Sequence, residues 1–119
     1  MMKLRQLEAR FVKLVLEPPQ EYWPQGRPTH HYVDSLAEAD GVFFLCPLCF
    51  AKNGGAVGTH MVGCWFKGKV PDWIEPGPGR WNPSGSSLDD LTFVGPEAVS
   101  VLLRAGCQWH GFVRNGDAA

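Results

Sequence analysis

The sequence predicts a mainly β domain (small α+β) in which antiparallel strands are joined by long loops. The chain has 119 residues, of which 45% are hydrophobic and 19% charged, as expected for one globular domain with one core. Its apolar residues fall in short runs rich in β-branched and aromatic side chains, a pattern typical of strands. Fourteen glycines and ten prolines predict extensive loops between these runs. We therefore expect a single domain, residues 1–119, with an N-terminal part (1–41) and a β core (42–116).

The N-terminal part is expected to contain a strand, a loop and a short helix. Residues 8–16 combine β-branched and large apolar side chains, which predicts a strand. A helix over residues 3–16 is an alternative, because apolar residues also recur there at helical spacing. Prolines predict a loop over residues 17–29, and residues 34–41 predict one or two helical turns.

The core is expected to consist of short strands at residues 42–45, 60–66, 91–94, 99–103 and 109–113. The first two should form a hairpin, with a glycine-bearing loop over residues 50–59 between them. Residues 67–87 are dominated by Pro, Gly, Trp and Ser, so we expect an irregular excursion there. The strand at 99–103 has an alternative as the end of a short helix that begins near Pro96.

Two half-sites with metal-ligand spacing lie beside predicted strands. Cys46 and Cys49 form a Cys-x-x-Cys pair, and Cys107 and His110 form a Cys-x-x-His pair. Together they offer three thiolates and an imidazole, a donor set typical of closed structural zinc sites. In a reducing compartment four cysteines favour metal binding over disulfides, and residues 50–55 are a poor helix start, which disfavours a thioredoxin-like redox pair. We therefore predict zinc ligation by Cys46, Cys49, Cys107 and His110; the alternative for the last two is a buried thiol and a hydrogen-bonded histidine.

His60 is the reserve ligand, because the return strand of the predicted hairpin would carry it past the Cys-x-x-Cys pair. Cys64 lies on the same strand, where a residue four positions away shares the same face, but a small core residue is the better interpretation. His30 and His31 lie in a proline-rich region and are expected to be solvated or structural.

The five tryptophans are many for this length. Most should cover the core, as large amphipathic rings do. Trp73, Arg80 and Trp81 lie on the irregular excursion and are candidates for binding a protein partner, since Trp and Arg are favoured interface anchors. The alternative is that these aromatic side chains fold back as a lid on the core.

A nucleophilic arrangement has weaker support. Ser100 and His60 are the candidate catalytic residues, with His110 as another base and Asp89 or Asp90 as the orienting acid. No Gly-x-Ser-x-Gly motif surrounds Ser100, and spacing alone does not bring these residues together.

Charge disfavours nucleic acid and acidic membranes as partners. Lys and Arg total 11 and Asp and Glu total 12, so the chain has no strong positive field. No apolar run approaches the ~18 residues of a membrane span, and the N-terminus lacks the apolar stretch of a signal peptide. We expect a cytoplasmic protein.

Five short motifs follow one another along residues 43–116: Cys46-Pro47-Leu48-Cys49, Gly58-Thr59-His60, Arg80-Trp81-Asn82, Asp90-Leu91-Thr92-Phe93 and Gly106-Cys107-Gln108-Trp109-His110-Gly111-Phe112-Val113-Arg114-Asn115-Gly116. In this order they resemble a family of small, uncharacterised phage and bacterial proteins that are often labelled "putative ammonia monooxygenase". That family is related to a peptidase-like family found in bacterial ubiquitin-like operons.

The resemblance implies a zinc-binding, β-rich phage or prophage protein in the cytoplasm of a bacterial host cell. It does not imply monooxygenase activity, because the enzyme of that name is a copper-dependent membrane assembly. We expect an accessory module that binds a protein. The operon-associated relatives carry a serine for which only Ser100 could stand here, and Met61 replaces another family serine. The alternative function is therefore a serine- or zinc-dependent peptidase-like hydrolase acting on a ubiquitin-like or other peptide substrate.

Overall fold

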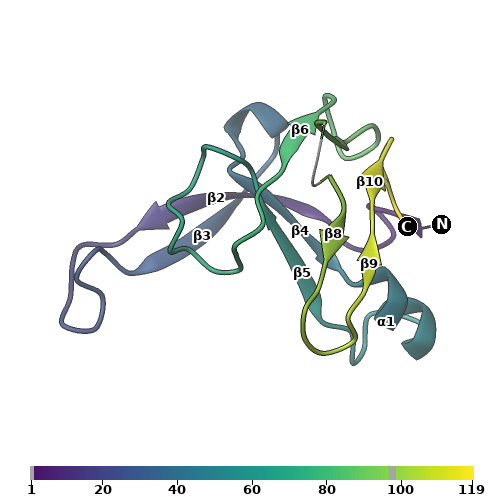
Figure 1. Cartoon of the computed structure of the whole chain (residues 1–119), viewed down its shortest axis with the longest axis horizontal. Helices are drawn as coiled ribbons and strands as arrows, with labels where there is room; N and C mark the ends of the chain where they lie inside the picture. The colour runs from purple at the N-terminus through teal and green to yellow at the C-terminus, as the bar shows by residue number, and fades with distance from the viewer. Residues whose placement is uncertain (1, 97–98) are drawn as a thin grey trace.

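A four-stranded antiparallel sheet forms the larger part of the fold (Figure 1). The computed structural model describes residues 2–96 and 99–119. The sheet has the order β3-β2-β4-β5. Its strands are β2 (Arg10–Leu16), β3 (Pro28–Val33), β4 (Gly41–Leu45) and β5 (Met61–Trp65). β5 is therefore an edge strand of this sheet.

Both faces of the sheet are covered over β2, β4 and β5, whereas β3 has no buried residue. Successive side chains of a strand point to opposite faces, so neighbours on β2 enter different clusters. Phe11 belongs to the main core, whereas Val12 packs with Trp65, Val70 and Ile74 in a second, smaller cluster. The segment that follows β5 thus covers one face, and the remaining strands cover the other.

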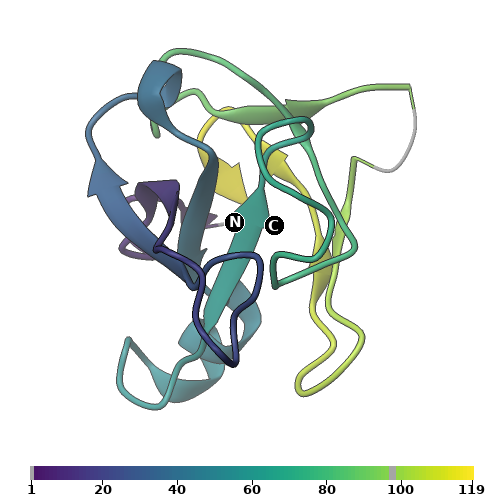
Figure 2. The ribbon, with the colours of Figure 1, turned by 90° about the vertical axis from the view of Figure 1, so that its left-hand side faces the viewer.

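The remaining strands are short and form three small sheets. β8 (Val101–Leu102) pairs with β9 (His110–Gly111), and β6 (Asn82–Ser84) pairs with β7 (Thr92–Val94). β1 (Met2–Lys3), β10 (Val113–Arg114) and β11 (Asp117–Ala118) form the third sheet. In Figure 2 the teal strand β5 lies between the rest of its sheet and the yellow-green β8–β9 hairpin. The main core joins these layers through buried residues that include Leu4, Leu7, Phe44, Val62, Phe66, Leu91, Phe93, Val101, Trp109 and Val113.

The predicted mainly β class is confirmed. β2 confirms the strand within residues 8–16, and the alternative helix over residues 3–16 is wrong, because residues 4–8 form only turns. The β4–β5 pairing confirms the predicted hairpin. The expected helical turns at residues 34–41 are a short 3₁₀ helix, η1 (Leu36–Glu38). The Glu38 N–H donates a hydrogen bond to the Ser35 hydroxyl, which caps the start of this helix. The predicted strands at 91–94 and 99–103 contain β7 and β8. The predicted strand at 109–113 contains β9 and the first residue of β10.

Two elements differ from the prediction. β3 begins inside the proline-rich region that we expected to be a loop, and it is the other edge strand of the sheet. Proline is tolerated at the first residue of an edge strand, and Pro28 occupies that position. The helix α1 (Pro47–Asn53) replaces the first part of the expected loop at 50–59.

The sequence of α1 carries signals that explain this helix. Pro47 is the first helical residue, where its missing N–H costs nothing. Gly54 ends the helix with a φ of 69°, the left-handed conformation in which glycine is favoured at this position. None of the helices in the described part of the chain has the length and apolar character that a membrane crossing requires.

Candidate metal centre

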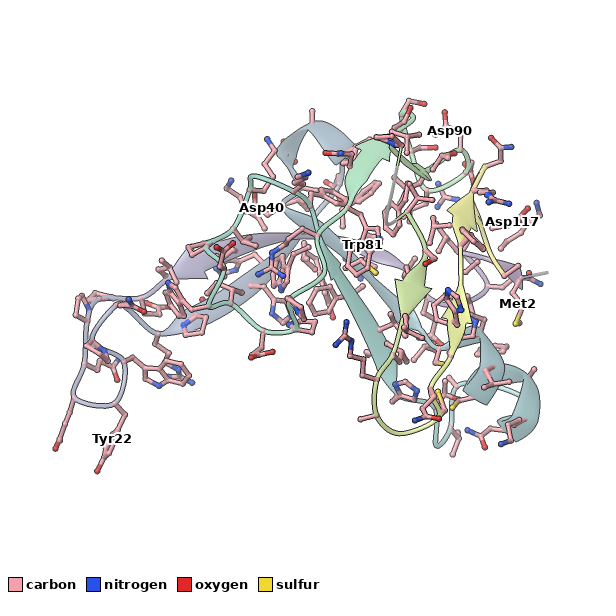
Figure 3. The ribbon with its side chains drawn as sticks, viewed as in Figure 1. Met2, Tyr22, Asp40, Trp81, Asp90 and Asp117 are labelled. Atoms are coloured by element: carbon pink, nitrogen blue, oxygen red, sulfur yellow. The ribbon has the colours of Figure 1, made fainter. Side chains whose placement is uncertain are left out.

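Three cysteines and one histidine converge at one end of the sheet. Their donor atoms, the Sγ atoms of Cys46, Cys49 and Cys107 and a ring nitrogen of His60, all lie within 4.8 Å of one another. Sulfur atoms, drawn yellow in Figure 3, gather where the β8–β9 turn approaches α1. The four cysteines of the chain are free thiols. This group can hold a metal ion.

The β4–β5 hairpin brings two of these residues side by side. Cys46 follows β4 directly, and its N–H donates to the carbonyl of His60 at 2.9 Å. The start of α1 then turns the chain so that Cys49 lies in the first helical turn. Cys46 and His60 thus lie at the two ends of the β4–β5 connection, where the strand register places them side by side.

The β8–β9 hairpin supplies the third thiol. Cys107 lies in its turn, where Gly106 and Gln108 have φ values of 65° and 56°. The Leu103 N–H donates to the carbonyl of Trp109 at 2.9 Å and closes the turn. The hairpin therefore presents Cys107 toward the opposite layer.

The spacing of the donor atoms fits tetrahedral coordination. Cys46 Sγ lies 3.6 Å from Cys107 Sγ, and His60 Nε2 lies 3.3 Å from the same sulfur. Zinc–sulfur bonds of about 2.3 Å and zinc–nitrogen bonds of about 2.0 Å imply tetrahedron edges of roughly 3.5–3.8 Å. The observed separations lie close to these edges. They are much longer than a disulfide bond, which is about 2.05 Å.

The orientation of the His60 ring suits ligation through Nε2. Its Nδ1 lies 3.3 Å from the carbonyl oxygen of Met61, so Nδ1 carries the proton when it donates to that oxygen. Nε2 then keeps its lone pair, which faces Cys107. A ligating histidine usually has its second nitrogen tied in this way, because the contact fixes the tautomer and the ring orientation.

The thiols differ in how readily they ionise. Burial is the main cause that raises the pKa of Cys46 to about 11, and its contact with Cys107 adds to the effect. Burial also raises the pKa of Cys107, but hydrogen bonds with His60, the Trp109 N–H and the neighbouring thiols outweigh it and lower that pKa to about 7. A metal cation bound among these sulfurs would displace the thiol protons, since metals bind the thiolate form.

His110 lies outside this group, in contrast to the expected ligand set. It is on β9, opposite Leu102, and its exposed ring lies 6.3 Å from that of Phe112. Trp109 turns inward and packs edge-to-face against Phe44. Because neighbouring residues of an extended strand point to opposite faces, burial of Trp109 turns His110 outward. His60, the reserve candidate, supplies the imidazole that lies beside the three thiols.

Cys64, His30 and His31 lie elsewhere in the fold. Cys64 is fully buried in the main core, and burial raises the pKa of its thiol, as expected for a small core residue. His30 and His31 lie on β3, where the His30 ring packs against Phe43 with centroids 5.3 Å apart.

No family model, no curated protein and no solved structure matches the chain.

The excursion after β5 is held in place by two of the predicted partner-binding residues. The Arg80 guanidinium donates to the backbone carbonyls of Pro71, Ile74, Pro76 and Gly79 at 2.9–3.1 Å. These bonds fold the excursion around one cation, so Arg80 has a structural role here.

Trp81 connects the excursion to the segment before β8. Its ring stacks on Phe93, with centroids 5.6 Å apart and planes at 20°, and its Nε1–H donates to the carbonyl of Ser100 at 3.0 Å. Trp73, the third predicted residue, is 36% exposed. The alternative that these aromatic side chains fold back as a lid on the core therefore applies to Trp81, which packs against the core, and not to the more exposed Trp73.

A groove of about 820 Å³ runs from Trp81 to the metal-ligand group. One wall is the end of the excursion (residues 76–81), and the other is the β8–β9 hairpin with its turn (residues 100–107). His60 and Gly63 also line it. We call this space the hairpin groove.

The residues considered for nucleophilic catalysis are dispersed. Ser100 and His60 both line the hairpin groove, but both His60 ring nitrogens already have partners. Asp89 pairs with Arg5, and Asp90 accepts from the Ser86 and Ser87 N–H groups. Among the described residues, no histidine lies within hydrogen-bond distance of the Ser100 hydroxyl.

Proposed function

We propose that this chain is a zinc-stapled accessory module that binds a protein partner through the hairpin groove. The convergence of three thiols and one imidazole at tetrahedral separations carries the proposal. Zinc is the metal that a thiolate-rich site with one imidazole suits best, because it prefers nitrogen and sulfur ligands in tetrahedral geometry.

A structural role for the ion follows from the ligand count. Cys46, Cys49, His60 and Cys107 would fill all four positions of a tetrahedral zinc ion. Catalytic zinc sites keep one position for water or substrate, whereas structural sites are closed by four protein ligands. The chain would therefore use the metal as a cross-link between two layers of the fold.

The cross-link would act on a hairpin that has little hydrogen-bonded structure of its own. β8 and β9 contain two residues each, and isolated two-stranded hairpins are marginal in water. Ligation through Cys107 would fix their turn against α1 and the start of β5. The same hairpin forms one wall of the hairpin groove, so the metal would keep the groove in shape.

The hydrolase alternative is favoured by one observation, the presence of Ser100 and His60 in the same groove. It requires His60 to act as a base for Ser100, or to leave the metal and open a coordination position. The commitments of both His60 nitrogens argue against this alternative. A peptidase would lose activity with Ser100→Ala, whereas a binding module would keep its partner.

Metal analysis with matched variants tests the metal part of the proposal. Purified wild-type chain should contain one zinc per molecule, and Cys107→Ser and His60→Ala should each lose most of it. His110→Ala is the control and should keep a full equivalent, because His110 lies on the exposed side of β9. Loss of zinc from His110→Ala with retention in His60→Ala would contradict the proposal, as would a wild-type stoichiometry well below one.

A further inference from the structure

The hairpin groove lies at the free edge of β5. Cys46 N–H bonds to its partner residue His60 across the β4–β5 pair, and Phe66 N–H bonds to Asp40 at 2.8 Å. Directly opposed residues of an antiparallel pair alternate between bonded and non-bonded positions. Residues 60, 62, 64 and 66 thus direct their backbone groups toward β4, and residues 61, 63 and 65 direct theirs outward.

The backbone of Trp81 already pairs with the end of this edge at residues 65–67. Its N–H donates to the outward carbonyl of Trp65 at 3.2 Å, and its carbonyl accepts from the Lys67 N–H at 2.8 Å. The contact is a parallel β-bridge between Phe66 and Trp81. Below it, Gly63 lines the groove with its N–H and C=O directed outward.

β8 presents a second free edge to the same groove. The bonded pair Leu103–Trp109 fixes the alternation on this hairpin, so residue 102 directs its backbone groups away from β9. The Ser100 carbonyl, two residues earlier, also points away from β9 and accepts from the Trp81 indole. Trp81 thus bridges the two edges at one end of the groove, and the edges at Gly63 and Leu102 continue beyond it.

The charge of the groove lining selects among possible occupants. Arg80 and Arg104 line it together with His60 and Cys107, and none of the described lining residues is Asp or Glu. The remaining lining residues are apolar or small, and Leu102 is 53% exposed. An apolar slot with two arginines and open backbone edges favours an extended segment with acidic side chains.

We propose that the hairpin groove binds an acidic, extended peptide segment of the partner protein as an added strand between β5 and β8. This inference rests on the proposed function, since it specifies what the groove binds. Backbone bonds to Gly63 and Leu102 hold the peptide, the apolar lining receives alternate side chains, and a carboxylate lies beside Arg104. Residues with free backbone N–H groups are required along the segment, so a proline in its centre is excluded.

The test uses full-length, zinc-loaded chain and a phage-displayed library of random twelve-residue peptides. Recovered peptides should be acidic, alternate in hydrophobicity and lack a central proline. One such peptide, synthesised with a fluorescent label, then serves as the probe. Hydrogen exchange of the wild-type chain should slow at the Gly63 and Leu102 amides when the probe is added, because both N–H groups gain a partner.

Two variant pairs separate backbone pairing from charge. Leu102→Pro removes the outward N–H and should weaken probe binding by about tenfold more than Leu102→Ala, which keeps it. Arg104→Glu should weaken binding roughly tenfold at low salt. Arg27→Glu makes the same charge change at an exposed position in the β2–β3 connection, and it should leave binding within about twofold.

The outcomes distinguish this inference from the proposed function. Zinc-loaded protein that recovers no peptide, or peptides that bind without slowing the two amides, overturns the inference and leaves the metal module standing. Protein without zinc that binds the probe as tightly as zinc-loaded protein overturns the role of the metal in shaping the groove and leaves the peptide inference standing. A second copy of the chain in the groove would show as a dimer in sedimentation that Leu102→Pro dissociates, and it would overturn the assignment to a partner peptide.

Discussion

Removal of the metal should destabilise the fold without unfolding it completely. The ion would close a loop of 47 residues between His60 and Cys107. The chain-entropy relation for cross-links assigns about 4 kcal/mol to a loop of this length. Zinc-finger peptides gain more, about 10–16 kcal/mol, because they have no fold without metal. Here most of the main core comes from residues outside the ligand group, so we expect the smaller figure.

Thermal unfolding followed by circular dichroism measures this effect. A loss of about 4 kcal/mol should lower the midpoint of wild-type protein by roughly 15–25 °C when a chelator replaces zinc. All variants must be measured at the same free zinc concentration before chelator is added, since bound ligand raises apparent stability by mass action. His110→Ala should show the same shift as wild type, and His60→Ala should respond little to chelator. Equal midpoints for wild-type protein with and without bound zinc would refute the cross-link.

Three further predictions concern the excursion after β5 and the turn before β7. Arg80→Met should lower the free energy of unfolding by about 2–3 kcal/mol, because four backbone carbonyls, two of them partly buried, lose a charged donor. Arg104→Met is the exposed control, and urea denaturation measures both. Trp81→Phe keeps the ring stack but removes the bond to the Ser100 carbonyl, so about 1 kcal/mol should be lost in the same assay. Asp90→Asn should make the free energy of unfolding fall less steeply than in wild type as the pH is lowered. Bonds from the Ser87 and Ser86 N–H groups lower the pKa of Asp90 below 3.8, so its stabilisation is present above that value and disappears as pH falls through the folded pKa; midpoints measured between pH 2 and pH 6 that run parallel in variant and wild type would contradict this.

The strands that form the site could be predicted because their sequence patterns are local. The apolar run before Cys46 and the run after His60 are of strand length, and the intervening glycines indicated a return. Pairing of β4 with β5 followed from these signals, and it is what places His60 opposite Cys46. What the sequence patterns did not provide was the register of the β4–β5 pair. Opposition of residues 46 and 60 would have made His60 the first choice instead of the reserve.

His110 misled the prediction because spacing along the chain says nothing about the direction of a side chain. A Cys-x-x-His turn brings both donors together only when the intervening residues keep the chain coiled. Here the chain becomes extended at Trp109, which the core buries against Phe44, and alternation then turns the histidine away. The aromatic residue before the histidine was a visible signal, since a large buried ring fixes the face of its neighbour.

α1 was missed because it has only seven residues and a proline and a glycine lie at its two ends. Pro47 and Gly54 disfavour a helix interior, yet they suit the first helical position and the left-handed cap that follows the last. Helix ends, rather than helix interior, therefore carried the signal. The helix also places Cys49 in its first turn beside Cys46, the arrangement of a redox pair. The third thiol and the imidazole distinguish the group from such a pair, because a redox pair needs only two sulfurs.

One hairpin connects the metal group with the groove. Cys107 lies in its turn, Leu102 on its outward edge and Arg104 between them, and all three line the groove. Trp81 holds the other end of the same wall through Ser100. With a metal bound, the hairpin would be fixed at two points, by ligation at one end and by the Trp81 indole bond at the other, with the open strand edges between them. An added strand needs two edges at a constant separation, because backbone bonds tolerate little change in length. The two anchors would supply that constancy, so the proposed metal site and the proposed peptide groove depend on the same hairpin.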